Sequence, residues 1–127
     1  MTPEDMKERT LELGSRILRL ADSLPNTHSG RTIGRQIVKS GTSIGANYRE
    51  ALHASSPRHF VTIFEIAQRE ANETTYWIEL IIRSGMLKQE QLAPLMDECN
   101  QVYAILTATI LSRKKNLNQP TPDPNHQ

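Results

Sequence analysis

Residues 41–45 of this chain, G-T-S-I-G, match the G-x-S-x-G pattern that surrounds the nucleophilic serine of many hydrolases. That motif needs a buried strand before the serine and a helix after it, on top of an α/β sheet. Here the residues before Ser43 recur with helical period, so the strand is missing. Asp97 and His126 follow in the order of a catalytic triad, but His126 lies in a proline-rich tail that we expect to be disordered. The sequence therefore argues against a serine hydrolase, and we expect a protein that is not an enzyme.

Residues that bind metals are present, but their spacing is not that of a metal site. The four histidines are scattered, and none lies in an H-x-x-x-H pair or at ligand spacing from Cys99. Glu70 and Glu73 are close in sequence, but a di-metal helical bundle needs Glu-x-x-His motifs, and residues 70–73 read E-A-N-E. The sequence therefore predicts no metal and no cofactor, and we interpret the two carboxylates as a polar cluster at an interface.

Four cations share one edge of segment 30–54 when its residues are placed on a helical wheel of about 100° per residue. This basic edge consists of Arg31, Arg35, Lys39 and Arg49. Arginine suits bidentate contacts with phosphate, so the basic edge is the candidate site for RNA or DNA. The whole chain has 15 Lys and Arg against 14 Asp and Glu, a formal charge of +1, so binding has to depend on this local patch. Alternatively, the cations pair with Glu70 and Glu73, within the chain or across an interface.

The elements that carry these residues are helical. Apolar residues recur at three- and four-residue spacing in four segments, and no useful length alternates with period two. We predict helices at about 3–23, 30–54, 57–83 and 88–115, joined by short loops. This pattern is typical of an antiparallel up-and-down four-helix bundle, formed as one domain by residues 1–115. Residues 116–127 contain three prolines among polar residues, which predicts a disordered tail.

Two of the predicted helices have, besides the apolar stripe that faces the core, a second stripe of small or apolar residues. Gly41 and Gly45 lie inside a helix, where each glycine costs about 1 kcal/mol relative to alanine, and close approach of another backbone would offset that cost. Beside the core stripe of helix 57–83 lies a second seam, which consists of Ile66, Glu70, Glu73, Trp77 and Leu80. The bundle either wraps over this seam, or another subunit covers it. Because exposed apolar patches mark partners, we favour an oligomer interface at the two glycines and the second seam.

The composition predicts a cytoplasmic protein. Cys99 is the single cysteine and cannot form an internal disulfide, which suits a reducing compartment. The first residues, M-T-P-E-D-M-K-E-R, have neither the basic leader nor the apolar region of a secretory signal. No apolar run approaches the roughly 18 residues that span a bilayer, so we expect no membrane partner.

The motifs together resemble a known bacterial family. The matching residues are L-P at 24–25, R-Q-I at 35–37, S-G-T-S-I-G-A-N-Y-R-E-A at 40–51, Phe60, E-A-N-E-T at 70–74 and Y-W-I-E-L at 76–80. They resemble the four-helix-bundle proteins named after the intervening sequences of 23S rRNA genes, and the related accessory variability determinant proteins of diversity-generating retroelements. The resemblance covers roughly residues 6–115. Many family members have Pro and then Glu-Gly where this chain has Gly45 and Glu50-Ala51.

The resemblance implies a four-helix up-and-down bundle that assembles as a ring-shaped homopentamer. In the retroelement branch it implies a basic barrel that engages nucleic acid and a reverse transcriptase. We therefore expect a non-enzymatic accessory protein whose partners are its own copies, RNA or DNA at the basic edge, and a reverse transcriptase or another protein. The alternative is a protein-interaction scaffold that binds no nucleic acid.

Overall fold

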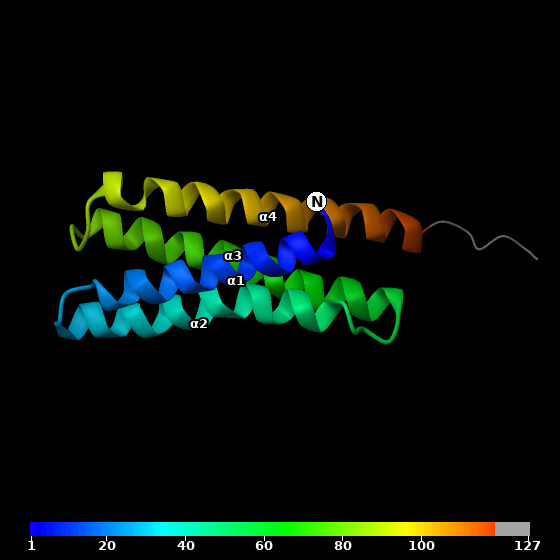
Figure 1. Cartoon of the computed structure of the whole chain (residues 1–127), viewed down its shortest axis with the longest axis horizontal. Helices are drawn as coiled ribbons and strands as arrows, with labels where there is room; N and C mark the ends of the chain where they lie inside the picture. The colour runs from blue at the N-terminus through cyan, green and yellow to red at the C-terminus, as the bar shows by residue number, and fades with distance from the viewer. Residues whose placement is uncertain (119–127) are drawn as a thin grey trace, which may run out of the picture.

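The computed structural model describes residues 1–118, and Figure 1 shows that they form long helices running up and down beside one another. The helices are α1 (Pro3–Asp22), α2 (His28–Ala51), α3 (Pro57–Arg83) and α4 (Gln89–Leu117). Within the described residues there is no strand. The prediction of an all-helical chain with four helices is confirmed.

Helix α3 begins and ends at the predicted residues, whereas the other three helices differ from the prediction at one or both ends. Helix α2 begins at His28 and not at residue 30, because the Thr27 hydroxyl accepts a hydrogen bond from the Gly30 N–H at 3.0 Å and caps the first turn. The helix ends at Ala51 and not at residue 54, because the backbone N–H groups of residues 52–54 bond three residues back, in the tighter pattern of a 3₁₀ turn.

Helix α4 continues through residues 116 and 117, which we predicted as the start of the tail. Leu117 is partly buried and packs against the core, so the last turn has an apolar contact that stabilises it. Residues 119–127, the rest of the predicted tail, lie outside the described residues.

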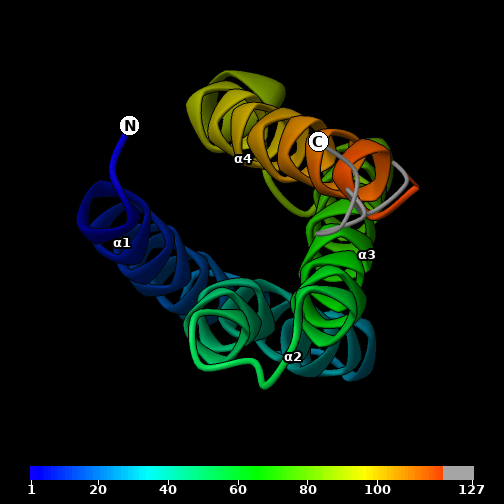
Figure 2. The ribbon, with the colours of Figure 1, turned by 90° about the vertical axis from the view of Figure 1, so that its right-hand side faces the viewer.

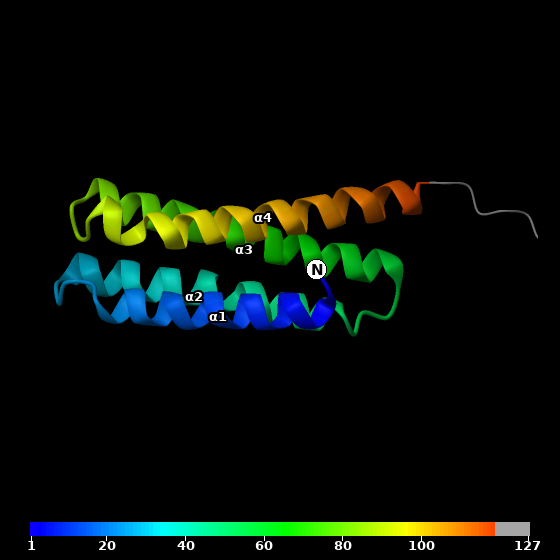
Figure 3. The same ribbon diagram turned by 45° about the horizontal axis from the view of Figure 1, so that its top comes forward.

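The chain order runs around the bundle from α1 through α2 and α3 to α4, as the view along its length shows (Figure 2). Consecutive helices make the main contacts, and the contact between the first and last helices, α1 and α4, is much smaller. Figure 3 shows the result as two hairpins, α1–α2 and α3–α4, lying side by side. The core between them is apolar. A hydrogen bond of 2.9 Å between the buried hydroxyls of Ser40 and Thr74 ties α2 to α3 halfway along the bundle.

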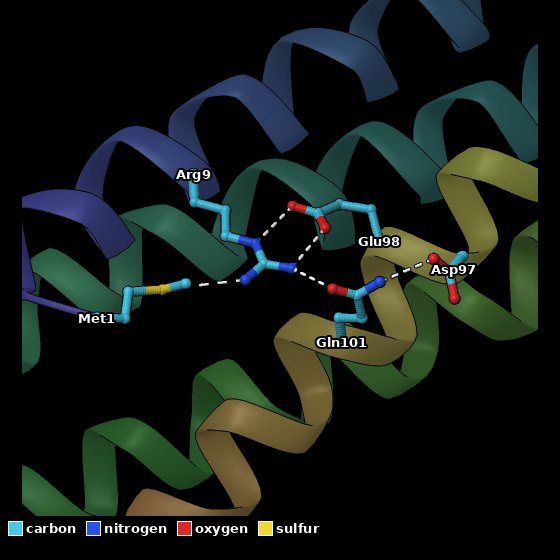
Figure 4. A network of polar contacts seen from close by, with 5 residues as sticks. All are labelled: Met1, Arg9, Asp97, Glu98 and Gln101. Atoms are coloured by element: carbon cyan, nitrogen blue, oxygen red, sulfur yellow. Dashed lines mark hydrogen bonds and ion pairs between the residues drawn. The ribbon is translucent and has the colours of Figure 1, made fainter.

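A polar network bridges the sparse side between α1 and α4 (Figure 4). The Arg9 guanidinium donates from Nε to Glu98 Oε2 at 2.8 Å and from Nη2 to Glu98 Oε1 at 2.7 Å. Arg9 Nη2 also donates to Gln101 Oε1 at 2.8 Å, and Gln101 Nε2 donates to Asp97 Oδ2 at 2.7 Å. Such a bidentate pair is among the stronger polar contacts, so it holds α1 against α4, which otherwise touch at few places.

Candidate nucleic-acid interface

Ser43 lies in the interior of α2, and its hydroxyl donates a hydrogen bond to the Lys39 carbonyl at 2.6 Å. The strand that a nucleophile elbow needs is absent from residues 1–118. Asp97 lies on α4 and accepts its hydrogen bond from Gln101, while His126 is outside the described residues. Residues 1–118 therefore do not form a nucleophile elbow around Ser43.

Gly41 and Gly45 face α1 of the same chain. A Cβ atom on Gly41 would lie 2.7 Å from Ile17 Cγ2, and one on Gly45 would lie 3.0 Å from Thr10 Oγ1. The expected close approach of another helix is present, but α1 provides it. The role of the two glycines at an oligomer interface stays a prediction: Gly41 is buried, whereas Gly45 is half-buried and lines a groove between α1 and α2.

The second seam is only partly covered by the chain. Ile66, Trp77 and Leu80 are half-buried. Of these three, only Trp77 packs against the core. Its indole Nε1 is buried without a hydrogen-bond partner among residues 1–118, and the ring of Tyr76 lies edge-on at 5.0 Å between centroids. The bundle therefore wraps over the tryptophan and leaves the rest of the seam partly open.

The two carboxylates of the second seam differ in environment. Glu73 is exposed and Glu70 is half-buried. Burial raises the pKa of the Glu70 carboxyl, as does the nearby charge of Glu73, whereas Lys39 and Arg69 oppose this shift. Among the described residues no ion pair joins either carboxylate to Arg35 or Arg49. Within residues 1–118 neither carboxylate forms an ion pair with the basic edge, although the charge of Lys39 acts on Glu70, and pairing across an interface stays a hypothesis.

The basic edge lies on the exposed face of α2, and all four of its cations are exposed. Arg31, Arg35 and Lys39 line one groove at the corner where α1 ends and α2 begins. Arg49 lies about 15 Å further along the axis than Lys39, beside a different groove that Leu11 and Leu18 also line. The structure thus brings three of the four predicted residues to one place and separates the fourth.

The groove beside these three cations has an apolar floor, which sequence reasoning missed. We call it the corner groove, and besides the cations its lining is Ala21, Asp22, Leu24, Pro25, Asn26, Gly30, Gly34 and Val38. Its shape depends on a tight turn, because a Cβ atom on Gly30 would lie 2.0 Å from the Pro25 carbonyl oxygen. A usable signal was the pair of glycines at positions 30 and 34, four residues apart on one helix face after the Leu-Pro turn.

Residues 4–108 match the model of a family described as "23S rRNA-intervening sequence protein". The chain belongs to this family. A crystal structure from Bacteroides thetaiotaomicron, described as a protein with unknown function from the S23 ribosomal protein family, is 39% identical, with a TM-score of 0.78. The similarity covers 83% of this chain and 97% of that one. Among curated proteins none matches the chain. The sequence resemblance is therefore confirmed.

The described part of this intervening-sequence family member offers little for metal or thiol chemistry. Residues 1–118 contain no group of three or more His, Cys, Asp or Glu side chains that could hold a metal ion. Cys99 is buried in the core, and burial raises the pKa of its thiol to about 12, so it stays protonated and unreactive near neutral pH. None of the helices in the described residues combines the length and apolar character needed to cross a bilayer.

Proposed function

We propose that this family member is a non-enzymatic accessory protein of the cytoplasm that binds RNA or DNA through the basic edge. The observation that carries the proposal is the row of Arg31, Arg35 and Lys39. All three are exposed, they share one groove, and within residues 1–118 none forms an ion pair. Cations without carboxylate partners are free to bind phosphate, and arginine does so with two parallel hydrogen bonds.

The same proposal includes assembly with further copies of the chain. Ile66 and Leu80 are half-buried but do not pack against the core, so the second seam still has apolar surface for a neighbour. The family resemblance implies a ring-shaped homopentamer. Assembly would repeat the basic edge in every copy, which raises the local positive charge although each chain carries a formal charge of +1 only.

Salt dependence tests nucleic-acid binding directly. Each phosphate contact changes the slope of log K against log salt by about −0.7 for a single strand and about −0.9 for a duplex. Three cations per chain should therefore give a slope of about −2 to −3 for each bound copy, measured by fluorescence anisotropy with a labelled oligonucleotide. A flat salt profile, or no binding at low salt, would contradict the proposal.

Charge reversal locates the site. The double variant Arg35→Glu with Lys39→Glu should abolish retention of RNA and DNA while sedimentation shows an unchanged oligomer. A matched control is Arg58→Glu with Arg83→Glu, which changes the net charge equally at two exposed positions of α3. Equal loss of binding in both double variants would indicate a general charge effect and no site at the basic edge.

A protein-interaction scaffold without nucleic acid is the second candidate, and one observation favours it. Leu11 is 56% and Leu18 is 47% exposed, and both line the groove between α1 and α2 that has Gly14 and Gly45 in its lining. Exposed leucines beside small residues suit docking of a partner helix. The double variant Leu11→Ser with Leu18→Ser should then abolish partner binding or assembly, and no shift should occur with RNA or DNA at low salt.

A further inference from the structure

The corner groove has both an apolar surface and a row of cations. Its floor is formed by the aliphatic side chains of Leu24, Pro25 and Val38. A Cβ atom on Gly34 would meet Leu24 Cδ1 at 3.7 Å, an ordinary contact. A side chain longer than glycine at this position would therefore contact Leu24 and occupy part of the groove that Gly34 lines.

One wall of the groove is the row of cations. Arg31, Arg35 and Lys39 follow one another at four-residue steps along α2, so they rise by about 6 Å per step. This step is of the same order as the distance between successive phosphates along an extended nucleic-acid strand. Arg31 Nη1 donates to Asn26 Oδ1 at 3.0 Å, which orients its guanidinium beside the turn. Asp22 is the one carboxylate in the lining, so cations outnumber it three to one there.

We propose that the corner groove binds single-stranded nucleic acid, with phosphates on the three cations and a base seated on the apolar floor. The inference rests on the proposed function, because it names the form of nucleic acid that the basic edge holds. The floor takes the flat, apolar face of a base, and the arginines take the phosphates on either side of it.

A duplex fits this arrangement less well. Its bases are paired and stacked inside the helix, so it can use the cations but not the floor, whereas an unpaired strand can turn a base outward. The lining contains no aromatic side chain among the described residues. The base contact is therefore aliphatic, and we expect little preference among base sequences, because stacking and apolar contact tolerate every base.

The test compares strands on the full chain. Fluorescence anisotropy at one salt concentration measures binding of a labelled mixed-sequence single strand and of a hairpin duplex with the same number of phosphates. The wild-type protein should bind the single strand several-fold more tightly, because an unpaired base can contact the aliphatic floor and a paired base cannot. Gly34→Met fills the groove with a flexible side chain and keeps every charge, so it should remove the preference and leave duplex binding within about two-fold.

Two further variants control for folding and position. Gly14→Met adds the same side chain to the neighbouring groove between α1 and α2, and it should keep the single-strand preference. Val38→Ser makes the floor polar without adding volume, and it should reduce the preference as Gly34→Met does. It provides the test if circular dichroism shows that Gly34→Met is unfolded.

The outcomes separate this inference from the proposed function. If the wild type binds single strand and duplex equally, or if both groove variants keep the preference, the inference fails while nucleic-acid binding stands. If the wild type binds neither probe at low salt, the proposed function fails as well. A glutamate-rich peptide that binds as tightly as the single strand and loses affinity in Gly34→Met would assign the groove to an acidic protein segment and overturn the inference.

Discussion

At the scale of single residues, Trp77 combines a favourable ring contact with an unfavourable polar one. Its ring packs on the core, while Nε1 is buried without a partner among the described residues. An unpaired buried donor costs about 1–3 kcal/mol, and the lost contacts of a large aromatic ring cost more. The two effects oppose each other, so substitutions at this position can separate them.

We predict that Trp77→Phe changes the free energy of unfolding by less than about 1 kcal/mol, because it removes the unpaired N–H while keeping a six-membered ring. Trp77→Ala should cost about 2 kcal/mol or more, because the ring contact is lost as well. Urea denaturation at fixed protein concentration measures both. If the phenylalanine variant is as unstable as the alanine variant, the unpaired N–H is not a significant cost.

The glycines of the α1–α2 contact provide a second prediction at this scale. Gly41→Ala would place its Cβ 2.7 Å from Ile17 Cγ2, a side chain that is fully buried. Overpacking of this kind costs about 1–3 kcal/mol, which exceeds the gain of about 1 kcal/mol in helix propensity. We therefore expect a lower melting temperature for Gly41→Ala.

The matched control is Gly14→Ala, where the nearest atom, Thr42 Cα, would lie 4.0 Å from the new Cβ. This variant should raise stability by up to about 1 kcal/mol, because the propensity gain meets no clash. Thermal unfolding followed by circular dichroism measures both variants. A stabilised Gly41→Ala protein would show that the helices can separate without cost.

At the scale of elements, the contact between α1 and α4 depends on Arg9 and Glu98. Each side chain is 20% exposed. The hydrogen bonds from Arg9 lower the pKa of the Glu98 carboxyl, and burial opposes that shift. A carboxyl whose pKa is lower in the folded state than in the unfolded state stabilises the fold at pH values above its unfolded-state pKa. This stabilisation is lost as the pH falls through the folded-state pKa.

We predict that Glu98→Gln lowers the free energy of unfolding at pH 7 by about 1–3 kcal/mol, because Arg9 loses its charged acceptor. The difference from the wild type should shrink as the pH falls below the ordinary pKa of a glutamate carboxyl, about 4.3. Denaturation from pH 7 to pH 3 measures this. Glu65→Gln is the control, since Glu65 pairs with Lys114 at a more exposed site, where the loss should stay below about 1 kcal/mol. Equal effects would contradict a special role for the α1–α4 contact.

At the scale of the whole molecule, the second seam is the surface where we propose that a neighbouring copy packs. Glu70 is half-buried there and its pKa is raised, mainly by burial. A partly desolvated carboxylate is stabilised when a cation of a neighbouring copy pairs with it. This would also use Arg49, which forms no ion pair within residues 1–118.

We predict that Glu70→Ala weakens assembly several-fold more than Glu90→Ala, because Glu90 is exposed in the first turn of α4. Sedimentation across a dilution series measures the dissociation of each variant. Equal oligomer stability for both would contradict the pairing. A wild type that sediments as a single chain at micromolar concentration, with an indole that water-soluble agents quench fully, would contradict assembly through the second seam.

Much of the fold followed from local patterns. Helix α3 begins after the Ser56-Pro57 pair, where the Ser56 hydroxyl accepts a hydrogen bond from the His59 N–H at 3.0 Å, as expected of an N-cap followed by proline. The ends of α2 were less predictable. Its first residue is set by the Thr27 cap, and its last residue is set by backbone N–H groups that bond to carbonyls three residues back. The number of helices and both ends of α3 were therefore predictable from the sequence, and the ends of α2 were not.

The part of the candidate site that lies on one helix was predictable from the sequence. The wheel positions of Arg31, Arg35 and Lys39 depend only on helix geometry, so the sequence determined that these cations share a face. Only the tertiary structure decided what lies beside them. Leu24 and Pro25 of the turn join Val38 at the floor of the corner groove, Gly41 and Gly45 face α1, and Arg9 reaches Glu98 across 89 positions in the chain. Periodicity reports which residues share a helix face, but it contains no information on which helix packs against that face.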